Sequence, residues 1–114
     1  MSVVDLVKKP ARTCTLAWCN GDHHETRSYR SHGSEVVHDG PSRFGRISWD
    51  EPLDAAARFV DRGTQIFVWM HGAEMRLTVR DANSLWKMLR AVGATEQAEF
   101  VGRMIVATAN GAES

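Results

Sequence analysis

Two cysteines and two histidines near the N-terminus are the residues of this chain best suited to chemistry. Cys14 and Cys19 are followed closely by His23 and His32. Thiolate and imidazole are the ligands that tetrahedral zinc prefers, and a structural zinc site uses four of them. The types and spacing of these residues therefore predict a zinc site with these four side chains as ligands.

Two further histidines are alternatives for the fourth ligand. His24 follows His23 directly, so its side chain points away if His23 binds the metal. His38 comes after the start of an expected strand. The alternative to any metal site is that the two cysteines are core residues, because free cysteine packs as a small apolar side chain.

Four soft or borderline ligands close the metal shell, whereas a catalytic zinc keeps one position open for water. The sequence therefore predicts a structural site and no catalytic residue. Asp22 and Glu25 flank His23 and are the candidate bases if the site is catalytic instead. A small metal-dependent hydrolase is the alternative that these two carboxylates leave open.

Length and composition are those of one soluble domain without a charge bias. The chain has 114 residues, with 14 Lys and Arg against 14 Asp and Glu. A dedicated nucleic-acid binder usually carries a basic excess. The first ten residues place their lysines after the apolar residues, which is the wrong order for a secretory signal. No apolar run is long enough to span a membrane. We expect a cytoplasmic protein with reduced cysteines.

A nucleic-acid-binding regulator is nevertheless an alternative, because basic and aromatic side chains gather near the cysteines. The residues concerned are Arg27, Arg30, Arg43 and Arg46, with Tyr29 and Phe44 as rings on which bases could stack. Acidic residues interrupt the same stretch, so a solvated face of mixed charge is the favoured interpretation.

The elements that must position the cysteines and histidines follow them in the chain. Residues 1–12 are expected to be a flexible arm, and residues 13–109 a single domain. Within it, residues 13–38 are poor in aliphatic side chains and cannot bury a core alone. Residues 43–79 predict an antiparallel sheet, and residues 80–109 predict helices, followed by a tail over residues 110–114.

Local patterns define the sheet and the helices. The strands are expected at Phe44–Trp49, Gln65–Met70 and Glu74–Val79, the last two joined by a turn at His71–Ala73. Thr78 is the expected cap of a first helix, and Gly93 its end. A second helix follows, and the short link makes the two helices antiparallel neighbours.

Trp18-Cys19-x-x-Asp22-His23, followed by Arg30-x-His32, resembles a segment of a family of small uncharacterised proteins from actinobacteria and their phages. Members of that family carry a C-P-x-W-C-x-x-x-H segment and a later histidine. The stretch 65–79 is similar to the family's strand–Gly-Ala-Glu–strand element. This chain departs from the pattern by lacking proline after Cys14 and by placing four residues between the cysteines. The resemblance implies a short sheet, a C-terminal helix and an actinobacterial or phage origin.

Residues 50–60 carry two conflicting signals. Apolar residues at helical spacing, Asp50 as a cap and Pro52 in a first turn favour a helix. The resemblance instead implies a strand over Ala55–Val60, and we follow it in expecting a strand there.

The expected fold is α+β: an N-terminal zinc knuckle, a small antiparallel sheet and one or two C-terminal helices. No convergent catalytic set and no nucleotide-binding loop is present in the sequence. The expected function is therefore a non-enzymatic, zinc-stabilised binding module. It would be an accessory or regulatory protein that acts through contacts with another protein, as a monomer or a homodimer.

Overall fold

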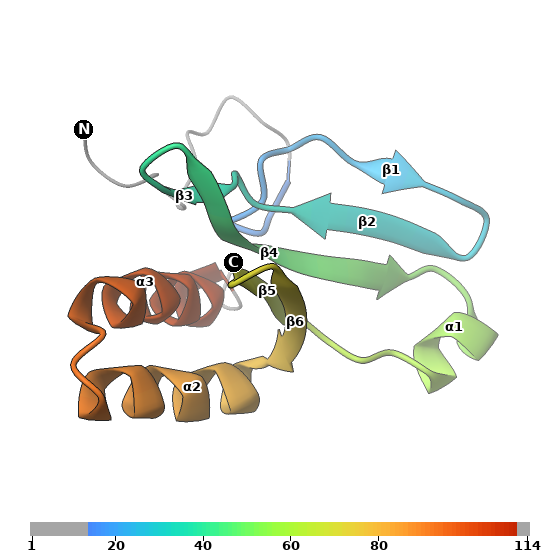
Figure 1. Cartoon of the computed structure of the whole chain (residues 1–114). Helices are drawn as coiled ribbons and strands as arrows, with labels where there is room; N and C mark the ends of the chain where they lie inside the picture. Colours follow the sequence, from blue (N-terminus) through green and yellow to red (C-terminus); the bar gives the residue numbers. More distant parts are fainter. Residues whose placement is uncertain (1–13, 112–114) are drawn as a thin grey trace.

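The computed structural model describes residues 14–111. The arm expected at residues 1–12 and residues 112–114 of the expected tail lie outside the described residues. Within the described range six strands and three helices follow one another (Figure 1). They are β1 (His24–Glu25), β2 (Tyr29–Gly33), β3 (Val37–Asp39), β4 (Ser42–Pro52), α1 (Ala55–Phe59), β5 (Gln65–Met70), β6 (Ala73–Thr78), α2 (Val79–Ala91) and α3 (Thr95–Gly111).

All strand pairings described are antiparallel, and the sheet order is β1-β2-β4-β5-β6, with β3 paired to β4. The long strand β4 lies at the centre, because β2 and β3 pair with one of its edges and β5 with the other. The α+β fold with an antiparallel sheet and C-terminal helices is thus confirmed.

The strands β5 and β6 form the predicted hairpin. Its turn places His71 at φ 54° and Gly72 at φ 77°. Two consecutive left-handed residues make a turn whose twist matches that of the flanking strands. The hairpin therefore follows from local turn chemistry.

The two C-terminal helices begin and end close to the predicted residues. Thr78 caps α2, and its hydroxyl accepts the N–H of Asp81 at 3.0 Å. Gly93, at φ 83°, ends the helix in the left-handed conformation that glycine adopts without strain. The helix α3 continues to Gly111, two residues beyond the range expected for the helices. Figure 1 shows α2 and α3 side by side.

The core lies between the sheet and the helices. Ile47, Ile66 and Val68 from the sheet and Val101 and Met104 from α3 have no exposed surface. They belong to one cluster of buried side chains that also contains residues from the Cys/His segment. One face of the sheet therefore carries the core, and the alternate side chains of each strand point to the opposite face.

The strand expected at Ala55–Val60 is wrong, because Ala55–Phe59 is the helix α1. Its cap is Asp54, whose carboxylate accepts the N–H of Ala57 at 2.7 Å. Asp50 and Pro52 do not begin this helix, since both lie in β4 and pair with β2. The local helical pattern was correct, but the long strand delays the start of the helix.

The Cys/His segment also contains two strands that the sequence pattern did not indicate. Both strands are polar; β2 pairs with β4, and β1 pairs with β2. A strand without apolar alternation can form when its neighbour satisfies its backbone.

Candidate metal centre

The loop over residues 14–23 packs on the face of the sheet that carries the core. Trp18 is 1% exposed and Cys19 is 2% exposed, and both belong to the main core cluster. Cys14 and Leu16 pack against that cluster. The loop therefore covers a part of this face beside the helices, and it is anchored there by Trp18.

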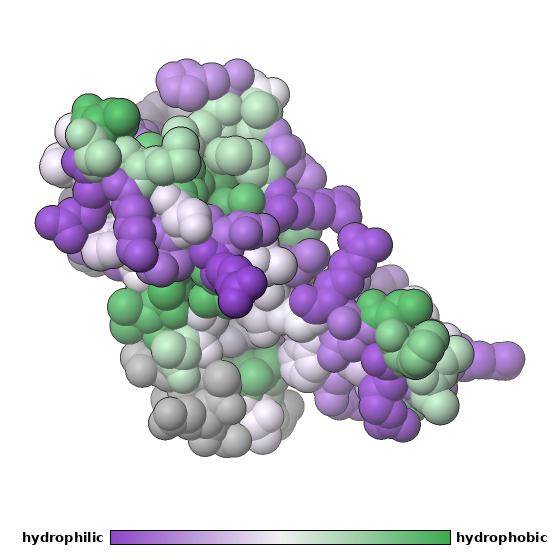
Figure 2. All heavy atoms as spheres, turned by 90° about the horizontal axis from the view of Figure 1, so that it is seen from below, coloured by the Kyte–Doolittle hydropathy of each residue, from purple (hydrophilic) through white to green (hydrophobic). Residues whose placement is uncertain are grey.

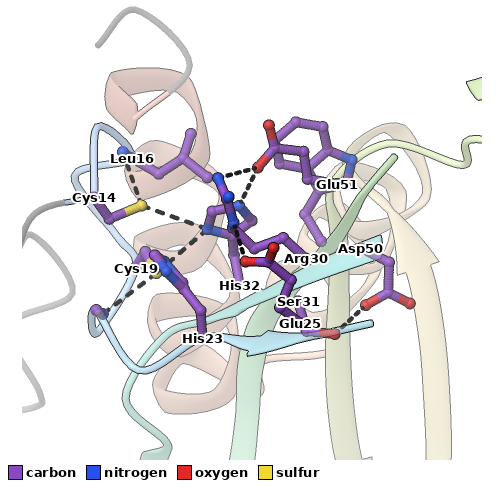
Figure 3. Close-up of polar contacts among 12 residues, drawn as sticks. Cys14, Leu16, Cys19, His23, Glu25, Arg30, Ser31, His32, Asp50 and Glu51 are labelled. Carbon is purple, nitrogen blue, oxygen red and sulfur yellow. Dashed lines mark hydrogen bonds and ion pairs between the residues drawn. The ribbon is translucent and has the colours of Figure 1, made fainter. Parts of the chain in front are cut away.

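Four side chains predicted as ligands converge at this loop. One donor atom from each of Cys14, Cys19, His23 and His32 lies within 4.8 Å of all the others (Figure 3). Cys19 and His32 are buried, whereas Cys14 and His23 are more accessible. These residues lie close enough together to hold a metal ion.

Three of the sulfur–nitrogen distances are close to the edges of a metal tetrahedron. Cys14 Sγ lies 3.4 Å from His32 Nδ1, and Cys19 Sγ lies 3.4 Å from His23 Nε2 and 3.6 Å from His32 Nδ1. Metal–sulfur and metal–nitrogen bonds of about 2.3 and 2.0 Å in a tetrahedron separate S from N by roughly 3.6 Å. The side chains are thus arranged around a common centre.

His32 is oriented by its neighbours on β4. Its ring stacks on Trp49, with 5.5 Å between ring centroids and 17° between planes. Its Nε2 lies 2.7 Å from Oε1 of Glu51. A hydrogen bond donated from Nε2 to this carboxylate leaves Nδ1 free to face the thiols, which is the arrangement of histidine ligands in metal sites.

Three charged residues, Glu25, Arg30 and Glu51, form a row across the strands beside His32, which we call the charged row. Arg30 lies between two carboxylates, with its Nε 3.0 Å from Glu25 and its Nη1 3.8 Å from Glu51 (Figure 3). The three residues are directly paired across β1, β2 and β4. Arg30 thereby holds in place the carboxylate that orients His32.

Backbone N–H groups point at both sulfur atoms. The N–H of Leu16 donates to Cys14 Sγ at 3.4 Å, and the N–H of Gly21 donates to Cys19 Sγ at 3.3 Å. In each case the donor is two residues beyond the cysteine. Gly21 has φ 87°, a conformation that side-chain-bearing residues rarely adopt. Such donors stabilise a thiolate over a thiol.

Desolvation shifts the pKa values of Cys19 and His23 in opposite directions. It raises the pKa of the Cys19 thiol, although the N–H of Gly21 opposes this shift. It lowers the pKa of His23, and the neighbouring His32 lowers that pKa further. The lowered pKa of His23 favours the neutral imidazole that binds metal, whereas the raised pKa of Cys19 favours the thiol over the thiolate that a metal requires.

The two alternative ligands lie elsewhere. His24 is exposed on β1 and His38 is exposed on β3. Among the described residues, neither belongs to the group that could hold a metal. The residue that the sequence analysis missed is Glu51, for which no linear signal exists, because it meets His32 only through the pairing of β2 with β4.

The residues of the other two hypotheses are dispersed. Glu25 is engaged by Arg30, and Asp22 is exposed at the end of the loop. Phe44 is 2% exposed in the core, so it cannot stack on a base. Arg43 and Arg46 lie on β4, and Arg46 points to the opposite face of the sheet from the charged row of Arg30. The arginine and aromatic residues of the nucleic-acid alternative thus do not form one surface.

Comparisons of the chain with known protein families, with curated proteins and with solved structures find no match. The interpretation of the site therefore depends on its own geometry. In residues 14–111, no helix has both the length and the apolar character needed to cross a membrane.

Proposed function

We propose that this chain is a non-enzymatic binding module whose N-terminal segment is stabilised by one structural zinc ion. Cys14, Cys19, His23 and His32 are the proposed ligands. The observation that carries the proposal is the set of sulfur–nitrogen distances, which matches a tetrahedral shell. Two sulfur and two nitrogen donors in this geometry favour zinc over the metals that prefer oxygen or planar coordination.

The proposed zinc is structural because the chain itself supplies four donors. Glu51 and the two N–H donors to sulfur support the shell from outside. The loop has few aliphatic residues, and metal binding would supply the folding free energy that its small core lacks. The hydrolase hypothesis has weaker support, since Glu25 is paired with Arg30 rather than aimed at the site.

A protein partner is the proposed target of the module, and α1 is the proposed contact. Phe59 is 93% exposed and Val60 is 59% exposed at the end of this helix. Figure 2 shows an apolar area over α1, separate from the larger body of the molecule. Exposed aromatic side chains often supply the central contacts of protein interfaces.

The proposed setting is the cytoplasm, where Cys14 and Cys19 stay reduced; both are free cysteines in the structure. The resemblance to actinobacterial and phage proteins supports the proposal of a phage or prophage origin. We propose an accessory or regulatory role in that setting, exerted through contacts with another protein.

Elemental analysis of the untagged protein, combined with thermal unfolding before and after a strong chelator, tests the zinc proposal. We expect one zinc per chain and a large loss of stability on chelation. Cobalt substitution should give the absorption of a tetrahedral site with thiolate ligands. His23→Ala should lose the metal, and the adjacent His24→Ala, as matched control, should keep it. Stability that does not depend on metal would refute the proposal.

The protein contact is tested by capture from the host with the intact chain and with Phe59→Ser. Met88→Ser is the control, because Met88 is also exposed, at 64%, but lies on α2. We expect Phe59→Ser to release a partner that the control retains. Equal capture by all three proteins would rule out α1 as the contact.

A further inference from the structure

The face of the sheet opposite the helices carries aromatic rings with arginine side chains beside them. Phe67 and Trp69 alternate on β5 with the buried Ile66 and Val68, so they point to this face. Both rings are half-buried rather than covered. We call this surface the open face; no helix among the described residues packs on these two rings.

One row of the open face crosses three strands. Phe67 pairs directly with Arg46 of β4 on one side and with Arg76 of β6 on the other. The guanidinium of Arg76 lies 5.2 Å from the centroid of the Phe67 ring. With neighbouring strands about 4.8 Å apart, the two arginines are separated at their Cα atoms by roughly 10 Å.

A second ring carries its own arginine. The guanidinium of Arg43 lies 4.3 Å from the centroid of a Trp69 ring. When the flat face of a guanidinium stacks on an aromatic ring, the N–H groups around its edge stay free. Two of these N–H groups can donate parallel hydrogen bonds to one phosphate. The outer plane of the guanidinium is also a surface on which a base can stack.

Arg46 is the least satisfied of these cations. Its Nε is a buried nitrogen with no hydrogen-bond partner. Its guanidinium lies across Gly33, where a Cβ atom would be only 1.8 Å from Nη2. Glycine at residue 33 therefore lets this cation lie flat on the sheet. Beside it is a hollow of about 360 Å³ whose lining includes Arg46, Ser48, Phe67 and Trp69.

Three carboxylates, those of Asp22, Asp50 and Glu74, also line this hollow, and two of them accept hydrogen bonds from neutral donors. Asp50 accepts the hydroxyl of Ser31 at 2.9 Å, and Glu74 accepts the indole N–H of Trp69 at 2.9 Å. The nearest arginine contact of Glu74 is with Arg76 at 3.8 Å. Within residues 14–111, neither Arg43 nor Arg46 forms an ion pair with a carboxylate. The guanidinium groups of these two arginines are therefore not neutralised by an acidic side chain in this range, although the Nε of Arg46 is buried.

We propose that the open face binds single-stranded nucleic acid. Arg43 and Arg46 would contact phosphate groups, and bases would stack on Phe67, Trp69 and the guanidinium planes beside them. The combination of rings and cations favours this ligand over an acidic peptide, which offers carboxylates but no flat surfaces. A single strand is favoured over a duplex because only unpaired bases can reach the rings. This inference depends on the sheet and goes beyond the proposed function of the zinc site.

Fluorescence anisotropy with a labelled single-stranded DNA of mixed sequence, measured on the full chain as purified and without chelator, tests the proposal. We expect saturable binding that weakens with salt. Arg46→Gln should weaken it about tenfold and reduce the slope of log K against log salt by about 0.7, the contribution of one phosphate contact. Arg103→Gln is the control, because it removes the same charge from an exposed residue on α3.

Two more variants separate stacking and geometry from charge. Trp69→Ala should weaken binding about tenfold without changing the salt slope. Gly33→Ala should also weaken it, since the new methyl group must displace the end of the Arg46 side chain. The unfolding midpoint of each variant shows whether it is folded under the conditions of the binding assay. If one of these variants is unfolded, Arg43→Gln is tested in its place.

Three outcomes would overturn the proposal. They are the absence of binding, an equal effect of Arg103→Gln and Arg46→Gln, and tighter binding of a glutamate-rich peptide or a duplex of matched length. Each is independent of whether the chain contains zinc, so failure here is distinguishable from failure of the zinc proposal.

Discussion

The carboxylate of Glu51 meets the imidazole of His32 at 2.7 Å on the edge of the ring that faces away from the thiols. The two residues are on neighbouring strands, β4 and β2. The contact fixes which nitrogen of His32 is available, because Nε2 is occupied by the carboxylate. The geometry of the candidate metal centre is therefore set partly by the sheet and not only by the loop.

Replacing Glu51 by glutamine should reduce zinc affinity without removing a ligand. The amide can still accept the Nε2–H, but it no longer places a negative charge behind the ring. Loss of such outer contacts typically costs 10–100-fold in metal affinity, and we expect about tenfold. Competition with a chromophoric chelator measures this, with Glu99→Gln on α3 as the control. An affinity unchanged by Glu51→Gln would show that the carboxylate does not support the site.

Gly21→Ala should weaken metal binding through the backbone. The residue has φ 87°, and forcing a left-handed conformation on alanine costs roughly 1–2 kcal/mol. Gly40 has φ 62° in the β3–β4 turn, with open space around it, so Gly40→Ala is a matched control. Both variants should lose stability in urea unfolding, and Gly21→Ala should lose more with zinc bound, because weaker zinc binding also lowers stability. Only Gly21→Ala should lower zinc affinity, and an equal zinc affinity of the two variants would contradict this role for Gly21.

Met104→Ala should be among the most destabilising single changes in the core. Met104 has no exposed surface and lies against Gly45 of β4. Truncating a buried methionine costs about 2–5 kcal/mol. Met88→Ala is the same chemical change at a residue that is 64% exposed, where less than about 0.5 kcal/mol is expected. Chemical unfolding of both variants with zinc bound checks the difference.

Asp54 makes the stability of α1 depend on pH. The N–H of Ala57 and the hydroxyl of Ser28 lower the pKa of this carboxyl in the folded chain. The stabilisation is therefore present above the unfolded pKa of about 3.9 and is lost as pH falls through the lower folded pKa. Asp54→Asn keeps a capping group that does not titrate.

Urea unfolding of the wild type and Asp54→Asn, at pH 7 and in steps below pH 4, measures this effect. The stability of the wild type relative to the variant should decrease as the pH falls. The loss of metal in acid affects both proteins and cancels in the comparison. A difference that stays constant with pH would mean that Asp54 does not titrate in the predicted sense.

The parts of the fold that could be predicted are those set by neighbours in the sequence. The turn at His71–Gly72 and the cap at Thr78 each act within four residues, and both were identified from residue type alone. The convergence of the four cysteine and histidine side chains was predicted for the same reason, since three of them lie in one short loop.

The missed features depend on strand pairing. β4 continues to Pro52 because β2 pairs with its C-terminal part, from Ser48 to Pro52, and no local signal encodes that partner. The start of α1 moves to Asp54 as a consequence. Glu51 was missed for the same reason, as its role exists only when β2 and β4 are in register.

Alternate residues of β4 point to opposite faces of the sheet, and each face carries a different proposed site. Arg46 and Ser48 point to the open face, while Ile47, Trp49 and Glu51 point to the core and the candidate metal centre. Inserting or deleting one residue within this strand would exchange the two sets. Such a length change should therefore disrupt both the open face and the candidate metal centre. The β3–β4 turn at Gly40 lies in open space and should accept added residues. The length of β4 is thus the property of this sequence that natural variation could alter least.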